Sequence, residues 1–253
     1  MQIKGLLIDL DGTVYENGSL IDGVADTINL LRSNNIPFRF VTNTTRKSRR
    51  IIVEQLAKMG LDVVPDDLFT APRAAVSWLR ERDIERLCLF LPEACHEEFD
   101  TFTIDNESPQ AILIGDLGED WSYDILNKGF RYLIDGARLV AIQKNRFWKT
   151  EDGVSLDAGP FVAALEFAAN VNAEIIGKPT PAFFQAAADS MDLTIRDVAM
   201  IGDDIQSDVG GAQNAGAHGI LVHTGKAGYE NEETSIRPYA RLESIKDLPE
   251  LLS

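Results

Sequence analysis

The sequence predicts an α/β fold built on a mainly parallel sheet, and two observations support this prediction. Short apolar runs recur along the 253 residues, and longer segments with apolar positions at helical spacing lie between them. Strand followed by helix, repeated many times, is typical of parallel sheets with helical connections. No linker rich in Pro, Gly or Ser interrupts the pattern, so any second domain is expected as an insertion with short hinges.

The pattern begins with a buried strand at Ile3–Leu10 and a helix at Asp22–Asn34. A strand at Pro37–Thr42 and a helix at Thr45–Met59 follow, and Gly60 is a common helix-stop residue. The remaining strands are predicted at Leu87–Leu91, Ala111–Ile114, Leu139–Ile142, Glu174–Ile176, Val198–Ile201 and Gly219–Val222, and the remaining helices at Tyr123–Ile134, Pro160–Ala169, Pro181–Met191, Ser207–Ala215 and Leu242–Leu252.

Composition argues against several classes of partner. The 24 basic and 40 acidic residues give a net charge of −16, which repels polyanions, so no nucleic-acid partner is expected. The densest basic stretch, Arg46–Arg50, is either the solvated start of a helix or a local positive field that draws a phosphorylated substrate. The N-terminus does not resemble a signal peptide, and no run approaches the ~20 apolar residues of a membrane helix. We therefore expect no membrane partner and a cytoplasmic location. Cys88 and Cys95 make neither a disulfide framework nor a zinc site.

Polar residues directly follow four of the predicted strands. Asp9 and Asp11, in the segment Asp9-Leu10-Asp11-Gly12-Thr13, end the first strand, and side chains two apart on a strand point to the same face. Two clustered carboxylates repel each other unless a cation binds or one of them takes a proton. Such a pair suits Mg²⁺, which prefers oxygen ligands, or a general acid. The alternative is a simple turn, because Asp-Gly is a frequent turn pair.

The next two motifs offer groups that bind phosphate. Thr42, Asn43 and Thr44 end a strand and can hold phosphate oxygens together with backbone N–H groups, or they cap the next helix. Lys178 follows the apolar pair Ile175-Ile176. It is either a solvated surface lysine or a cation that neutralises a carboxylate nucleophile and a phosphate oxygen together.

The fourth motif contains Asp203, Asp204 and Asp208 after the strand Val198–Ile201. These acids complete an oxygen-rich metal site, whereas helix N-capping would explain one acid and not three. In open parallel sheets, ligands bind beyond the carboxyl ends of the strands. The four motifs together therefore predict a nucleophile, a hydroxyl, a cation and metal ligands at one edge of a sheet.

These residues resemble the motifs of the haloacid dehalogenase superfamily. Asp9–Thr13 resembles its first motif, Thr42-Asn43 its second, Lys178 its third, and Gly202–Asp204 with Asp208 its fourth. A second aspartate after the nucleophile position is specific for the phosphatase branch of this superfamily.

Two further stretches, Leu165–Ala168 and Ile176–Pro181, are similar to the NagD-like subfamily IIA, and within it to the branch of phospholysine/phosphohistidine inorganic pyrophosphate phosphatase. In this superfamily, a long gap such as that between Thr42 and Lys178 holds the α/β type of cap. The implied domains are a Rossmann-like parallel-sheet core of residues 1–75 and 176–253 and an inserted α/β cap of residues 76–175.

The resemblance also implies a role for each motif residue. Asp9 is the nucleophile and a Mg²⁺ ligand, Asp11 is the general acid/base and binds the metal through its main-chain carbonyl, and Asp203 binds the metal directly. The transferring phosphoryl group is bound by Thr42, Asn43, Thr44 and Lys178, while Asp204 and Asp208 hold the metal through water or orient its ligands.

The sequence therefore predicts a Mg²⁺-dependent phosphohydrolase that acts on a small phosphorylated molecule through an aspartyl-phosphate intermediate. Three alternatives stay open: a phosphotransferase such as a mutase, a phosphate-signalling receiver module, and a binding protein that keeps the fold without turnover. Caps of this subfamily often form dimer contacts, so a homodimer through the cap is a further expectation.

Overall fold

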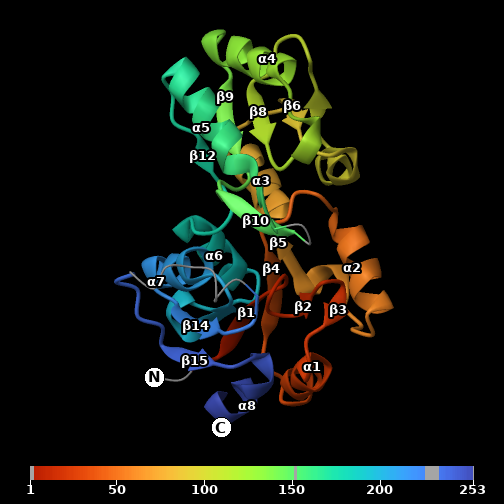
Figure 1. Ribbon diagram of the computed structural model, residues 1–253, viewed down its shortest axis with the longest axis vertical. Coiled ribbons are helices and arrows are strands. Elements are labelled where there is room, and N and C mark those ends of the chain that lie inside the picture. Colours follow the sequence, from red (N-terminus) through yellow and green to blue (C-terminus); the bar gives the residue numbers. More distant parts are fainter. Residues whose placement is uncertain (1–2, 151–152, 226–233, 253) are drawn as a thin grey trace. The chain divides into compact units, whose positions relative to one another are not determined.

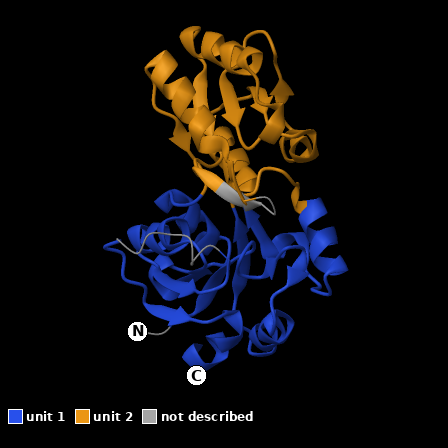
Figure 2. Ribbon diagram, viewed as in Figure 1, with its two compact units in different colours: residues 1–42, 50–70, 178–253 blue, residues 43–49, 71–177 orange. Residues whose placement is uncertain are grey.

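The structure is a computed structural model that describes residues 3–150, 153–225 and 234–252 (Figure 1). Its contacts divide the chain into two compact units, and each unit contains its own parallel sheet (Figure 2). The predicted α/β class is therefore confirmed. Unit 1 comprises residues 1–42, 50–70 and 178–253, and unit 2 comprises residues 43–49 and 71–177.

The sheet of unit 1 has six parallel strands in the order β15-β14-β13-β1-β4-β5. Strand β1 lies between β13 and β4, with Ile8 opposite Ile201 on one side and Asp9 opposite Val41 on the other. The carboxyl ends of these three strands consequently lie next to one another. The strands are β1 (Gly5–Asp9), β4 (Phe38–Thr42), β5 (Leu68–Thr70), β13 (Val198–Gly202), β14 (His218–Val222) and β15 (Ala240–Leu242).

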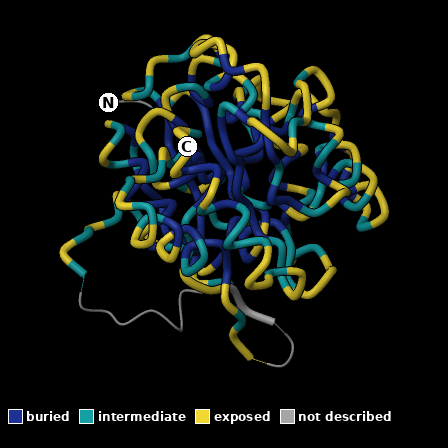
Figure 3. Tube along the Cα trace, turned by 90° about the horizontal axis from the view of Figure 1, so that it is seen from above, coloured by how far each residue is buried: buried dark blue, intermediate teal, exposed yellow. Residues whose placement is uncertain are grey.

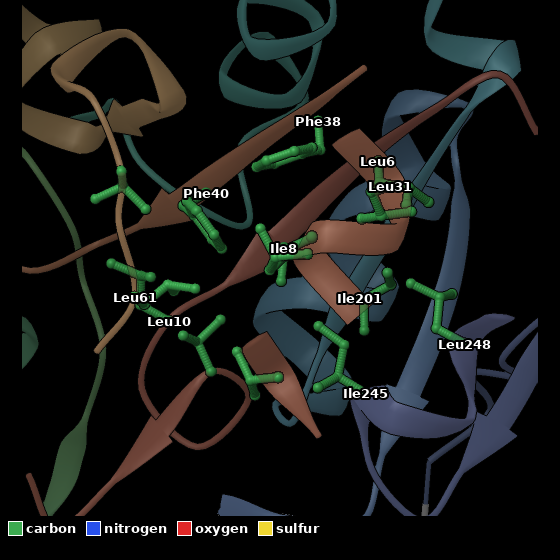
Figure 4. Close-up of a cluster of buried hydrophobic side chains, with 14 of the residues drawn as sticks. Leu6, Ile8, Leu10, Leu31, Phe38, Phe40, Leu61, Ile201, Ile245 and Leu248 are labelled. Atoms are coloured by element: carbon green, nitrogen blue, oxygen red, sulfur yellow. The ribbon is translucent and has the colours of Figure 1, made fainter. Parts of the chain in front are cut away.

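Helices surround this sheet, and a hydrophobic core fills the space between them. Leu6 and Ile8 of β1, Phe40 of β4 and Leu31 of α1 are wholly buried and point toward one another (Figure 4). Burying each such side chain contributes roughly 1.5–3 kcal/mol. The central strands are mostly buried, while the exposed residues lie mainly on outer loops and helices (Figure 3). The helices are α1 (Val24–Ser33), α2 (Arg49–Lys58), α6 (Pro181–Asp189), α7 (Gly211–Ala215) and α8 (Leu248–Leu252).

The expected closing helix at Leu242–Leu252 is wrong in its first half. Leu242 ends β15, where it pairs with Val222 of β14. Ser244 then starts a short 3₁₀ turn, because its hydroxyl accepts a hydrogen bond from the Lys246 N–H at 3.3 Å. Strand pairing and this cap together leave only the last residues to form α8.

Unit 2 contains a five-stranded parallel sheet in the order β12-β9-β8-β6-β7. Helix α3 and the antiparallel hairpin of β10 and β11 were not predicted from the sequence. Both cysteines, Cys88 and Cys95, are buried free thiols in this unit. The elements are α3 (Ala71–Arg80), β6 (Arg86–Phe90), β7 (Thr103–Ile104), β8 (Ala111–Ile114), α4 (Tyr123–Ile134), β9 (Arg138–Ala141), β10 (Phe147–Thr150), β11 (Gly153–Leu156), α5 (Ala158–Ala169) and β12 (Glu174–Ile175).

Within the described ranges, no helix has both the length and the apolar character that are needed to span a bilayer.

Candidate active site

Asp9 is the last residue of β1, at the carboxyl edge of the unit 1 sheet. The strand forms here because the run Gly5–Asp9 suits a central position that is buried on both faces. Asp9 is only 7% exposed, and its Oδ1 accepts a 2.6 Å hydrogen bond from Lys178 Nζ. A buried carboxylate needs such a partner, because removing its charge from water is otherwise very unfavourable.

Lys178 follows β12 and is 4% exposed, so it is not a solvated surface lysine. Its ammonium group also donates to Asp208 Oδ1 at 2.7 Å. Burial lowers the pKa of Lys178, but the Asp208 and Asp9 carboxylates outweigh this effect and raise the pKa above its usual value. Lys178 is therefore a charged group that joins two carboxylates.

Three buried carboxylates form one cluster in the described part of unit 1. Asp9, Asp203 and Asp208 each offer an oxygen atom, and these atoms lie within 4.8 Å of one another. Asp203 directly follows β13, the neighbour of β1 in the sheet, and Asp208 lies in the π-helical segment Ile205–Gly210. The sequence predicted that Asp208 holds the metal through water or orients its ligands. In the structure Asp208 shares one cluster with Asp9 and Asp203, two of the expected metal ligands.

The charge of this cluster favours a bound cation. Burial raises the pKa of Asp208; Lys178 opposes this shift, and the nearby Asp9 and Asp204 carboxylates add to it. Lys178 contacts Asp9 and Asp208, and the three carboxylates lie close enough to repel one another, so adding a proton or a cation to the cluster is favourable. Buried, clustered carboxylate oxygens are ligands that a hard cation such as Mg²⁺ prefers. The donor set therefore fits a divalent metal ion held by Asp9, Asp203 and Asp208.

Asp204 plays a different part from its two neighbours in the motif. Its Oδ1 accepts hydrogen bonds from the backbone N–H groups of Gln206 at 3.1 Å and Ser207 at 2.7 Å. This is the N-cap arrangement that the sequence offered as an explanation for one aspartate. The Asp204 N–H donates in turn to Asp208 Oδ2 at 3.2 Å, so the capped turn also orients Asp208.

Asp11 lies past the end of β1 and is exposed, whereas Asp9 is buried. Its backbone forms an isolated bridge with Tyr15. Burial raises the pKa of the Tyr15 phenol, and the Asp11 and Asp9 carboxylates raise it further, so both carboxylates act on the same side chain. The Asp9 carboxylate, which is hydrogen-bonded to Lys178, and the exposed Asp11 carboxylate therefore both act on the Tyr15 phenol.

The second motif divides between the two units. Thr42 is the buried last residue of β4 in unit 1, while Asn43 and Thr44 are partly buried and belong to unit 2. Helix α2 begins only at Arg49 and not at the predicted Thr45. The helix-capping alternative for these three residues is therefore wrong, because the helix starts well after them.

The basic stretch is largely paired with acids. Within unit 2, Arg46 Nε donates to Asp116 Oδ2 at 2.7 Å, and Arg49 Nε to Glu98 Oε2 at 3.2 Å. Arg50 forms a pair with Glu54 one turn along α2, at 2.9 Å. These carboxylates weaken the local positive field that the sequence offered as one alternative.

Two further residues, not predicted from the sequence, lie next to the acid cluster. Thr224 and Gly225 follow β14, and the Thr224 hydroxyl donates to the Gly12 carbonyl. A signal was present, since these residues come directly after the predicted strand Gly219–Val222, where the other motifs were found.

Comparisons with known proteins identify the family of this chain. The chain matches the family profile described as haloacid dehalogenase-like hydrolase over residues 6–105, and a second profile of the same kind over residues 175–248. It is 39% identical over 244 residues to the Bos taurus haloacid dehalogenase-like hydrolase domain-containing protein 2, covering 96% of this chain and 93% of that protein. It is 35% identical over 230 residues to the human phospholysine phosphohistidine inorganic pyrophosphate phosphatase, covering 88% of this chain and 84% of that protein.

Solved structures share the fold over the full length. The p-nitrophenyl phosphatase from Archaeoglobus fulgidus superposes with a TM-score of 0.92 at 26% identity, covering 100% of both chains. NagD from Escherichia coli K-12 superposes with a TM-score of 0.88 at 22% identity, covering 98% of both chains, and this likeness shows the fold alone. The chain therefore belongs to the haloacid dehalogenase-like hydrolases and has the fold of their NagD-like branch, with an α/β core and an α/β cap domain.

Proposed function

We propose that this hydrolase is a Mg²⁺-dependent phosphatase that acts on a small phosphorylated molecule through an aspartyl phosphate formed on Asp9. The observation that carries the proposal is the buried Asp9 carboxylate, fixed by Lys178 and clustered with Asp203 and Asp208. The names of the human relative and of the archaeal structure, both phosphatases, support phosphate as the group transferred.

In the proposed reaction, Asp9 attacks phosphorus while Asp11 protonates the leaving oxygen, and Asp11 then deprotonates the water that releases phosphate. Covalent catalysis divides one difficult displacement into two easier steps. Lys178 holds Asp9 Oδ1, so the second oxygen of Asp9 is left to act as the nucleophile. The exposed Asp11 can exchange protons with solvent, as a general acid and base must. Mg²⁺, when bound by Asp9, Asp203 and Asp208, supplies positive charge for the transferring phosphoryl oxygens.

Thr42, Asn43 and Thr44 are proposed to bind the other phosphoryl oxygens. Thr42 is the last residue of β4, the strand next to β1. The residue before it, Val41, lies opposite Asp9 in the parallel pairing. Hydroxyl and amide groups at a strand end suit this task, because they donate hydrogen bonds without adding charge. Asp204 and the main-chain carbonyl of Asp11 are proposed to orient or complete the metal's ligands.

The test is hydrolysis of 4-nitrophenyl phosphate with and without Mg²⁺. We expect steady release of inorganic phosphate, loss of turnover with a chelator, and recovery when Mg²⁺ is restored. Asp203→Asn is expected to raise the Mg²⁺ concentration for half-maximal activity at least about 10-fold, since even the outer partners of metal ligands change affinity by 10–100-fold.

Asp197→Asn is the matched control, because Asp197 precedes the same strand, β13, at its opposite end and pairs with Lys4 at the surface.

Undiminished turnover in chelator would contradict the metal requirement. A phosphoaspartate that persists for minutes would favour a receiver module, and transfer of phosphate to a sugar hydroxyl would favour a mutase. A folded protein that releases no phosphate from any substrate in a broad screen of phosphorylated metabolites would favour a binding protein.

The predicted cap, residues 76–175, is proposed to close over the substrate and to form a homodimer. An exposed apolar patch on the β10–β11 hairpin supports a self-association surface: Val154 is 65%, Leu156 61% and Phe147 41% exposed. Replacing Val154 and Leu156 with lysine is expected to convert a dimer to a monomer in sedimentation velocity, because charges at a desolvated contact are unfavourable. Val64→Lys, at an exposed apolar residue of unit 1, is the control. A wild-type protein that sediments as a monomer would contradict the dimer.

A further inference from the structure

The loop that follows β14 reaches the acid cluster from a strand that carries none of the predicted site residues. Strand β14 pairs with β13 in parallel, with Leu221 opposite Gly202. Because Asp203 directly follows Gly202, residues shortly after Leu221 emerge at the same edge of the sheet. Thr224 and Gly225 are these residues, and both lie within unit 1.

Thr224 fixes the turn that carries Asp11. Its Oγ1 donates a 2.5 Å hydrogen bond to the Gly12 carbonyl, while the Gly12 N–H donates to the Tyr15 carbonyl at 2.8 Å. Both peptide groups of Gly12 are therefore held. The Asp11 carbonyl and the Gly12 N–H belong to the same peptide group. Because this group is planar, the hydrogen bond of the Gly12 N–H also sets the direction of the Asp11 carbonyl.

Gly225 lies against both Asp203 and Gly12. It has a φ of +66°, and a Cβ added to it would overlap Asp203 Oδ2 and lie 2.7 Å from the Gly12 Cα. Gly12 has a φ of +79°, and a Cβ on it would overlap the same carboxylate and lie 3.0 Å from the Gly225 Cα. Real Cβ atoms essentially never approach other atoms under 3.0 Å. The Asp203 carboxylate is thus packed against two glycine backbones with no room for a side chain on either.

We infer that Thr224 and Gly225 are positioning residues of the active site: Thr224 holds the Asp11–Gly12 turn by its hydroxyl, and Gly225 lets the loop pack against the Asp203 carboxylate. This inference rests on the proposed function, because it assigns the loop a role in the same site. Neither residue touches the reacting atoms. Their effect is exerted through the direction of the Asp11 main chain and through the place of Asp203.

The first test replaces Thr224 with valine, which keeps the shape and removes the hydroxyl, and with serine, which keeps the hydroxyl. We expect Thr224→Val to lower kcat/KM about 10-fold and to weaken Mg²⁺ binding, since a hydrogen bond of this kind contributes about one order of magnitude in an equilibrium. Mg²⁺ binding is measured by isothermal titration calorimetry on the protein without substrate. Thr224→Ser is expected to restore both quantities to within about 2-fold of wild type.

The second test replaces Gly225 with alanine and uses Gly60→Ala as the control. Gly60 also has a positive φ, +91°, but a Cβ on it would meet nothing within 4 Å. Both variants carry backbone strain, whereas only Gly225→Ala pushes against Asp203. We expect Gly225→Ala to lose Mg²⁺ binding and at least about 100-fold in kcat/KM, and Gly60→Ala to keep both while its unfolding midpoint falls.

Three results would overturn the inference. They are a folded Thr224→Val with wild-type Mg²⁺ binding and turnover, a Thr224→Ser as impaired as Thr224→Val, and a Gly225→Ala no worse than Gly60→Ala. Circular dichroism and the unfolding midpoint establish that each variant folds. A wild-type protein that neither binds Mg²⁺ nor releases phosphate contradicts the proposed function instead, so the two failures are distinguishable.

Discussion

Replacing Asp9 with asparagine is expected to reduce the release of phosphate from 4-nitrophenyl phosphate by a factor on the order of 10⁴ or more, as removal of a covalent nucleophile does in other enzymes. The amide keeps the size of the carboxylate but cannot attack phosphorus. The fold should persist, since Lys178 retains its 2.7 Å partner Asp208. Single-turnover kinetics with Mg²⁺ measure the loss of activity. Quenching the wild-type reaction with acid traps the aspartyl phosphate, so that the phosphorylated enzyme can be detected.

Asp26→Asn is a suitable control for this variant. Asp26 is an exposed acid in the first turn of α1, in the same unit, and we expect its turnover to equal that of wild type. Turnover by Asp9→Asn at the level of this control would remove Asp9 from the proposed mechanism. It would also separate the acid cluster from catalysis, because Asp9 is one of the three clustered carboxylates.

Replacing Lys178 with methionine is expected to impair both activity and stability. The buried Asp9 and Asp208 carboxylates lose their common partner, and breaking a buried ion pair in this way costs about 3–5 kcal/mol of the free energy of unfolding. Turnover should fall roughly 10²–10³-fold, the usual loss when a group that stabilises transition-state charge is removed. Urea unfolding in chelator and kcat measurements with Mg²⁺ test the two effects separately.

The loss of stability should depend on pH in a defined direction. Burial raises the pKa of the Asp208 carboxyl above that in the unfolded chain, and without Lys178 nothing from that lysine opposes the shift. A group whose pKa is raised by folding destabilises the fold increasingly as the pH rises above its unfolded value. The difference in unfolding free energy between Lys178→Met and wild type should therefore grow from pH 5 to pH 8.

Lys4→Met removes an exposed lysine that pairs with Asp197 at 3.0 Å, and it serves as the matched control. A surface pair of this kind contributes about 0–1 kcal/mol. If Lys178→Met lost no more stability than Lys4→Met, the buried ion pairs would not hold the cluster together. If it kept full activity, Lys178 would have no part in the reaction.

Local pattern was sufficient for many of the strands and helices. Ala111–Ile114 and Tyr123–Ile134 lie where the sequence predicted them, because an apolar run and an amphipathic period are local properties. The hairpin of β10 and β11 was not predicted, since its strands are short and Phe147, Val154 and Leu156 are exposed. Leu242 was assigned to a helix but lies in β15, because pairing with β14 outweighs the local preference of a short segment.

The candidate site shows the same division between local and tertiary information. The sequence pointed to Asp203, Asp204 and Asp208 together, but it did not separate their tasks. The π-helical turn places Asp208 against Lys178. The Asp204 carboxylate instead accepts hydrogen bonds from the N–H groups that begin this turn. Spacing along the chain could not give this result, because it depends on which way each side chain leaves the turn.

The sequence by itself determined the α/β class and the strand ends at which acids, hydroxyls and a lysine would gather. Apolar runs and the spacing of apolar residues are local properties, so neighbouring residues are enough to reveal them. Only the tertiary structure decided that Lys178 joins Asp9 to Asp208 across 169 and 30 positions of the chain. It also decided that Thr224 and Gly225 close around Asp203 and Gly12. The physical reason is that strand order in the sheet, set by the packing of the whole unit, brings these distant loops to one edge.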